Sequence, residues 1–152
     1  MNMCTKWCMD LMEKYRDVAP LLLRLSVGAT FFMHGWQKLM VWGVPEVTKF
    51  LTVLGFPAPT VFAYLLIAGE LIAGAALILG ICTHFAAKTT AIIALIALVL
   101  VHLKNGFYAS NGGYEFILLI LVVSISLLIT GAGKYSIDAK WFRKDDGMMN
   151  QA

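Results

Sequence analysis

Charge is what this 152-residue sequence has least of. Only 14% of its residues are Asp, Glu, Lys or Arg, about half the share in an ordinary soluble domain, whereas 60% are hydrophobic. Intrinsic disorder is excluded, because a disordered chain needs low hydrophobicity and high charge. The net charge of +3 comes without a dense run of Lys and Arg, so we expect no nucleic acid among the partners.

Cysteine is also scarce, and its spacing disfavours one kind of chemistry. The three cysteines, Cys4, Cys8 and Cys82, form no C-x-x-C pair, which argues against dithiol exchange. Cys4 and Cys8 are four residues apart and could share a helix face, but no histidine stands near them to complete a zinc site. We therefore predict no metal site.

Long apolar runs, by contrast, dominate the chain. Four of them follow one another, over residues 18–39, 58–80, 85–103 and 114–130. Runs of about 18 or more residues are typical of membrane-spanning helices, and these runs lack the polar stripe of a soluble amphipathic helix. The alternative is a soluble bundle of unusually apolar helices. We predict an all-α integral membrane four-helix bundle, with the lipid bilayer as its first partner.

More polar segments flank this predicted four-span domain of residues 18–132. Residues 1–17 place apolar and charged side chains on opposite sides of a helix, which is typical of a short interfacial helix. The C-terminal tail, residues 133–152, has Trp141 among basic residues and is expected to anchor at the interface in the same way. Between the first two spans, the apolar residues 47–54 indicate a short helix lying on the surface.

The distribution of Lys and Arg predicts the orientation in the membrane. Most of them fall on the side shared by both termini and the loop after the second span, and only Lys38, Lys49 and Lys104 fall on the other side. Cytoplasmic loops carry the excess of positive charge. Both termini are therefore predicted to be cytoplasmic.

Six ionisable side chains stand within the spans or at their edges, where a charge costs about 2.5–3.5 kcal/mol at mid-helix. They are Arg24, His34, Lys38, Glu70, His102 and Glu115. At a rise of about 1.5 Å per residue from the span edges, Arg24 and Glu70 differ by only about 6 Å in depth. We predict a structural Arg24–Glu70 ion pair between the first two helices. Gly28 and Gly74 on the same faces indicate a close packing seam.

The other ionisable residues form a second cluster in the outer half of the bundle. His34 and His102 lie at similar depths, about 24 and 21 Å from the cytoplasmic edge by the same count. Histidine and carboxylate groups exchange protons with a quinone oxygen, so His34, His102 and Glu115 are predicted catalytic residues. The predicted ligand-binding residues are Lys38, Trp36, Asn105 and Phe107.

Two other interpretations of this cluster stay open. The two histidines are also the residues needed for axial ligation of a haem, which we disfavour because no C-x-x-C-H attachment motif is present. Alternatively, both histidines are interfacial and satisfied by water and loop carbonyls, with Trp36 a belt residue at the membrane surface.

The ordered motifs of this chain resemble those of the DoxX family of small membrane proteins. The motifs are L-L-L-R-L at 21–25, H-G-W-Q-K at 34–38, G-E-L at 69–71, H-L-K-N-G-F at 102–107, G-Y-E at 113–115 and G-K-Y-S-I-D at 133–138. The resemblance implies a multi-pass protein of the bacterial inner membrane, similar to the membrane subunit of thiosulfate:quinone oxidoreductase.

The resemblance also implies a function, which we state as an expectation. The chain would be the membrane subunit of a quinone-linked oxidoreductase system, with quinone as its ligand. Because it carries no separate soluble redox domain and no paired cysteines, activity would depend on a partner subunit or a homo-oligomer. The alternatives are a small-molecule permease or stress-related membrane protein, and a non-catalytic membrane anchor for a partner.

Overall fold

The computed structural model describes residues 3–141, and every regular element in that range is a helix. The long helices are α1 (Met3–Tyr15), α2 (Val18–Gln37), α3 (Gly43–Val53), α4 (Pro59–Leu79), α5 (Thr83–Ala97) and α6 (Glu115–Thr130). Two π-helical segments, η1 (Lys38–Trp42) and η2 (Leu98–His102), continue α2 and α5. The predictions for the side chains of Cys4 and Cys8 and for residues 142–152 lie outside the described part.

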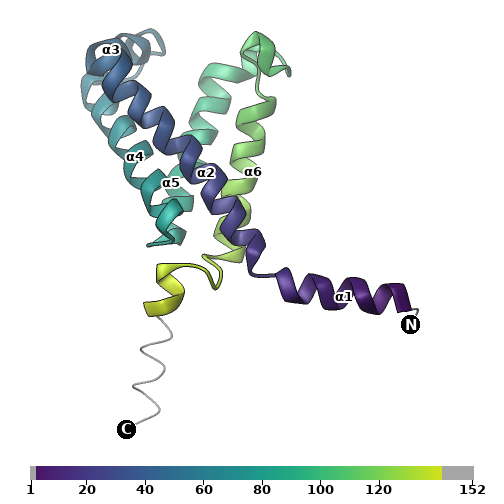
Figure 1. Ribbon diagram of the computed structural model, residues 1–152. Coiled ribbons are helices and arrows are strands. Elements are labelled where there is room, and N and C mark those ends of the chain that lie inside the picture. Colours follow the sequence, from purple (N-terminus) through teal and green to yellow (C-terminus); the bar gives the residue numbers. More distant parts are fainter. Residues whose placement is uncertain (1–2, 142–152) are drawn as a thin grey trace.

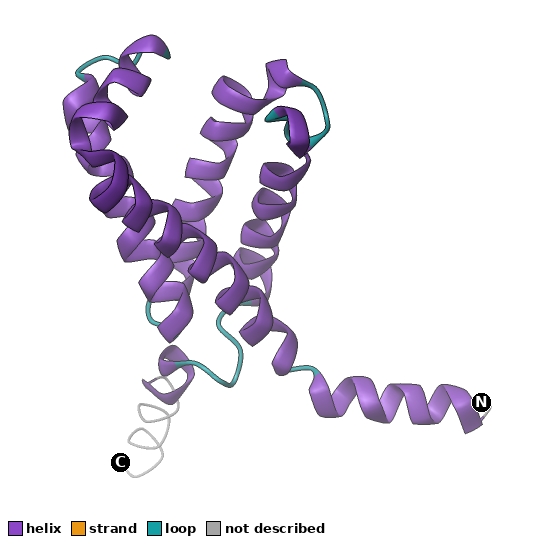
Figure 2. Cartoon of the chain, turned by 45° about the horizontal axis from the view of Figure 1, so that its top comes forward, coloured by secondary structure: helices purple, strands orange, loops and turns teal. Residues whose placement is uncertain are grey.

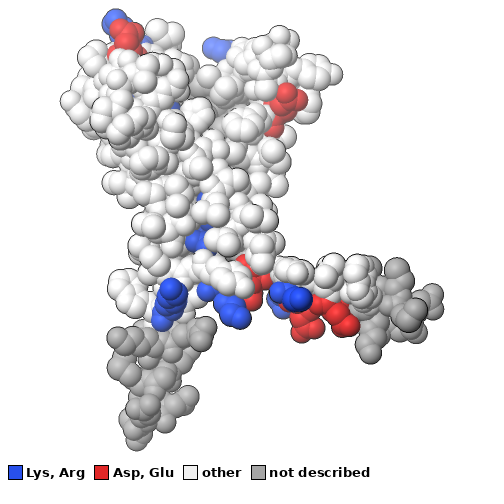
Figure 3. All heavy atoms as spheres, viewed as in Figure 1, with Lys and Arg blue, Asp and Glu red and all other residues white. Residues whose placement is uncertain are grey.

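The helices confirm the predicted all-α membrane bundle. Three helical stretches are long and apolar enough to cross a membrane, namely Val18–Val53, Pro59–Leu79 and Thr83–Asn105. The fourth apolar helix, α6, is shorter, with 16 residues. In the space-filling view of Figure 3, charged side chains gather at the two ends of the bundle and the band between them is almost free of charge. This is the surface expected of a protein embedded in lipid.

The bundle is closed at one end and splayed at the other (Figures 1 and 2). Helix α2 packs mainly against α4, and α5 packs mainly against α6. At the closed end, α1 projects sideways and the segment after α6 returns beneath the helices. At the splayed end lie α3 and the two short 3-10 turns η3 (Leu103–Asn105) and η4 (Ala109–Asn111).

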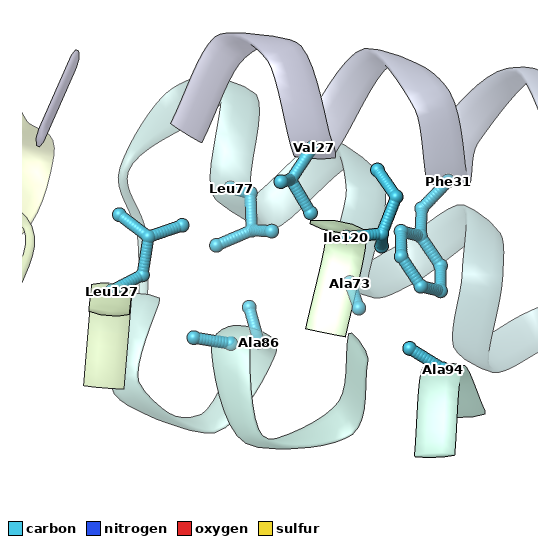
Figure 4. Close-up of a cluster of buried hydrophobic side chains, with 9 residues drawn as sticks. Val27, Phe31, Ala73, Leu77, Ala86, Ala94, Ile120 and Leu127 are labelled. Atoms are coloured by element: carbon cyan, nitrogen blue, oxygen red, sulfur yellow. The ribbon is translucent and has the colours of Figure 1, made fainter. Parts of the chain in front are cut away.

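Small residues allow the predicted close seam between α2 and α4. A side chain at Gly74 would place its Cβ 2.5 Å from the backbone nitrogen of Phe32 and 2.8 Å from the carbonyl of Gly28. Gly69, in contrast, faces Ile93 of α5. Around the seam, all four bundle helices contribute to one apolar core (Figure 4). Its labelled members are Val27, Phe31, Ala73, Leu77, Ala86, Ala94, Ile120 and Leu127.

The predicted helix over residues 47–54 is observed as α3, but it is not a simple surface helix. One of its faces buries Val47 and Leu51 against Ala63 and Ile67 of α4. The chain also does not end its first helical stretch near residue 39, because η1 joins α2 directly to α3. Helix α3 therefore belongs to the wall of the splayed end.

Candidate functional site

A buried ion pair lies at the splayed end of the bundle. The Nζ of Lys38, where α2 becomes η1, lies 2.7 Å from both carboxylate oxygens of Glu70 on α4. The two side chains are 13% and 6% exposed. A charge in apolar surroundings is stable only when it is paired and hydrogen-bonded. Lys38 therefore provides the counter-charge and the hydrogen bonds that stabilise the buried Glu70 carboxylate.

This pairing corrects the predicted Arg24–Glu70 ion pair. Among the described residues, the guanidinium of Arg24 donates instead to the carbonyl oxygens of Leu77, at 3.2 Å, and Tyr135, at 2.5 Å. Its side chain lies against Gly80 at the end of α4. Glu70 lies ten residues before Gly80 in that helix, about 15 Å from it in the direction of the splayed end.

The depth count failed because it placed the start of α2 and the end of α4 at one height. The observed register sets Arg24 beside Leu77 and Gly80, so α2 begins about 9 Å below the end of α4. The same register places Gly35 against Glu70. Lys38, one turn beyond His34, is therefore the basic residue within reach of the Glu70 carboxylate.

Two histidines accompany the ion pair, although the depth count had placed them in a cluster separate from Glu70. His34 and His102 both line the cavities that contain Lys38 and Glu70. The Nδ1 of His102 lies 2.7 Å from the carbonyl oxygen of Gly112. Because a carbonyl only accepts hydrogen bonds, Nδ1 carries the hydrogen and, in the neutral ring, Nε2 keeps its lone pair. Gly112 therefore fixes which nitrogen of His102 can accept a proton.

Both π-helical segments occur at this level of the bundle. Lys38 is the first residue of η1 and His102 is the last residue of η2. A π-helical turn widens the helix and shifts the side chains that follow, and such turns are frequent at functional sites. The two interruptions thus flank the polar cluster from opposite sides.

Two cavities meet at the polar cluster. The larger, about 860 Å³, lies among α3, α4, α5 and η2, and the smaller, about 320 Å³, extends toward α6 and the loop at Ala109–Gly113. Six residues line both cavities: His34, Lys38, Glu70, Ile93, Ala97 and His102. We call the four polar members, His34, Lys38, Glu70 and His102, the polar wall. Volumes of roughly 300–1,000 Å³ are typical of small-molecule sites.

Four predicted site residues line neither cavity. Glu115 accepts a hydrogen bond from the backbone nitrogen of Ala109 at 2.7 Å, and Asn105 donates to the carbonyl of Gly112 at 3.1 Å. Trp36 is 45% exposed on the outside of α2, and Phe107 packs edge-on against two tyrosines of its loop. Glu115 and Asn105 hold the loop whose Gly112 orients His102.

The contribution of η1 and α3 to the larger cavity was not predicted from the sequence. Trp42, Glu46 and Phe50 line it, although the segment was expected only to lie on the surface. A usable signal was present, because these residues are spaced four apart and would share one face of a helix. The Glu46 carboxylate also accepts a hydrogen bond from Lys49, one turn on, at 2.5 Å.

The opposite end of the bundle is closed by the segment after α6. The two carboxylate oxygens of Asp138 accept hydrogen bonds from the backbone nitrogens of Cys82 and Thr83, each at 2.8 Å. Arg24 ties the same segment to α2 through Tyr135. The G-K-Y-S-I-D motif therefore caps the start of α5 and holds the helices together at the closed end. We call these contacts of Arg24, Tyr135 and Asp138 the clamp.

The fold and the site together define a class: a membrane-embedded helical bundle with a polar wall between two cavities. The sequence model of the DoxX family matches residues 19–103, more than half of the chain. The chain belongs to the DoxX family.

Two relatives extend this similarity beyond the matched region. A protein of Bacillus subtilis (strain 168) named "Putative oxidoreductase CatD" is 33% identical over 132 residues, which cover 87% of this chain and 93% of the relative. A protein of Haemophilus influenzae named "Uncharacterized protein" is 30% identical over 141 residues, 90% of this chain and 100% of the relative. No solved structure matches the chain significantly.

Proposed function

We propose that this protein is the membrane component of a quinone-linked redox system and binds the quinone headgroup at the polar wall. The observation that carries the proposal is the Lys38–Glu70 ion pair, held with His102 beside a cavity of about 860 Å³ inside an otherwise apolar bundle. The word oxidoreductase in the name of the Bacillus subtilis relative supports a redox role.

Each polar residue has a role that follows from its chemistry. Lys38 donates to a quinone carbonyl oxygen without leaving Glu70, because an ammonium has three hydrogens to donate. His102 exchanges a proton with that oxygen through Nε2, since Nδ1 is held by Gly112. His34 orients the ring from the turn below Lys38. Glu115 and Asn105 are positioning residues that act through the loop.

The proposal includes a partner and an orientation. Electrons would reach the quinone from a protein partner subunit, because the sequence has no C-x-x-C pair. We assign the closed end, where the described part of the chain begins and ends, to the cytoplasmic side of the bacterial inner membrane, because basic side chains gather there. Reporter fusions after residue 152 should then be active only in the cytoplasm, and a periplasmic signal would invert the orientation.

Tryptophan fluorescence tests the binding site directly. Trp42 lines the larger cavity, whereas Trp36 does not. Two variants that each keep only one of these tryptophans, with Trp7 and Trp141 replaced by phenylalanine in both, therefore form a matched pair. In lipid nanodiscs, a methyl-substituted benzoquinone without a side chain should quench Trp42 saturably and Trp36 only in proportion to its concentration.

The paired variant Lys38→Met/Glu70→Gln removes both charges and leaves neither buried alone. Its affinity for the same quinone should fall about tenfold, or about 1.4 kcal/mol. Quenching of both tryptophans alike, or an unchanged affinity in the paired variant, would contradict the proposed site.

A further inference from the structure

Apart from the polar wall, Glu46 and Thr89, the larger cavity has an apolar lining. The polar wall lies at the splayed end of the bundle, and most of the remaining lining comes from aliphatic and aromatic side chains. Along α5 and η2 the lining runs from Thr89 to His102, a length of about 20 Å at the helical rise.

The apolar part of this cavity opens between α4 and α5. The two helices approach closely at Gly69, where an added Cβ would lie 3.4 Å from Ile93, and diverge toward the splayed end (Figures 1 and 2). Beyond Gly69 the lining residues Leu65, Ile96 and Leu100 are 61%, 43% and 41% exposed. In a membrane, side chains with this exposure face lipid. The cavity is therefore open sideways, toward the hydrocarbon core.

We propose that the groove between α4 and α5 binds the hydrocarbon tail of the quinone and admits the ligand from within the bilayer. This inference rests on the function proposed above. The site has a polar wall and an adjoining apolar groove. A ligand with a polar ring and one long hydrocarbon chain matches both parts, which is why we assign the groove to the tail of a quinone. The groove would add affinity through burial of the chain, while the polar wall supplies recognition of the ring.

Two variants on one helix separate the groove from its surroundings. Ile96→Trp fills the groove, whereas Leu95→Trp places the same bulk on a residue that is 49% exposed and lines neither cavity. Binding is measured by calorimetry in nanodiscs of one lipid composition, with a decyl-substituted quinone and with the quinone that lacks the chain. Comparison between variants cancels the partition of each ligand into lipid.

The expected result is selective. Ile96→Trp should weaken binding of the decyl quinone about tenfold, since a pocket that loses room for a few methylenes discriminates on that scale, and leave the chain-free quinone unaffected. Leu95→Trp should change neither. If Ile96→Trp weakened the binding of both ligands equally, or did not weaken the binding of the decyl quinone, the groove would not be the site of the chain. The proposed headgroup site would still be possible. Failure of the unmodified protein to bind either ligand would overturn the proposed function as well.

A labelling experiment on the unmodified protein avoids the risk that Ile96→Trp does not fold. A quinone with a photoreactive diazirine at the end of its chain should label α4 and α5 near Leu65 and Ile96, and excess decyl quinone should suppress the label. Labelling that competitor does not suppress, or that falls on α2 and α6 instead, would mean that a membrane lipid or another surface takes the chain, and the proposal would fail.

Discussion

The two ends of the bundle each hold a cation in apolar surroundings, yet the structure closes around one and leaves space beside the other. At the closed end, Arg24 is fully buried and donates to two backbone carbonyls. At the splayed end, Lys38 pairs with Glu70 along two cavities. The difference teaches that a buried charge in this bundle can be enclosed by backbone carbonyls, as at Arg24, or can adjoin a cavity, as at Lys38, where we propose that it binds a ligand.

The comparison predicts the largest loss of stability at Arg24. Arg24→Met removes both charged hydrogen bonds of the clamp and leaves carbonyl oxygens without a donor, so we expect the free energy of unfolding to fall by about 4 kcal/mol. SDS titration followed by circular dichroism measures this change. Arg16→Met, on an exposed residue, should stay within about 0.5 kcal/mol. If the two substitutions lowered the free energy of unfolding equally, the hydrogen bonds of Arg24 would not stabilise the closed end.

The second prediction concerns the tight contact at Gly80. Its φ is +69°, and an added Cβ would collide with the Arg24 guanidinium, so Gly80→Ala should lower the free energy of unfolding by about 3 kcal/mol. Gly55 has a similar φ of +79° but no atom near the added Cβ. Gly55→Ala should therefore cost only about 1 kcal/mol, and the same titration compares them. A Gly80 variant no worse than its Gly55 control would show that the closed end is not tightly packed.

Energetic coupling distinguishes the observed pair from the one that the sequence predicted. In a double-mutant cycle, Lys38→Met and Glu70→Gln should couple by about 2 kcal/mol, because the single variants each leave a charge unpaired. Arg24→Met and Glu70→Gln should combine additively within about 0.5 kcal/mol. Coupling of Glu70 to Arg24 instead of Lys38 would reverse the assignment.

The smallest effect is expected at the cap of α5. Asp138→Ala removes two hydrogen bonds to backbone nitrogens, which costs about 1 kcal/mol at a helix start. Lys140→Ala, two residues on and exposed, is the control and should change stability little. Thermal unfolding in detergent compares them, and a quinone affinity unchanged in both would agree with the separation of clamp and polar wall. A lower quinone affinity in Asp138→Ala would show instead that the clamp affects binding at the polar wall.

The apolar runs predicted the helices and the membrane because hydrophobicity over about 18 residues needs no knowledge of tertiary contacts. The convergence of His34, Lys38 and His102 also followed from depth along each helix. The partner of Glu70 did not follow, because it depends on the relative height of α2 and α4, which close contacts such as Gly28–Gly74 set. A shift of a few residues between two helices is invisible in either helix alone.

The site details that the sequence did not predict have a similar cause. The choice between Trp36 and Trp42 depends on which face of the first helical stretch meets the cavity, and Trp42 shares that face with His34 and Lys38. Glu115 has the right depth for the cavity, but it accepts a hydrogen bond from Ala109 within its own loop. A local backbone partner of this kind cannot be read from the spacing of polar residues.

Quinone that stays bound to the purified protein is the strongest test of the polar wall as a ligand site. The protein is extracted from native membranes with mild detergent, and bound quinone is measured by solvent extraction and absorbance, for the unmodified chain and for Lys38→Met/Glu70→Gln. We expect quinone approaching one per chain in the unmodified protein and a loss of most of it in the paired variant. No quinone in the unmodified protein, or equal amounts in both, would contradict it.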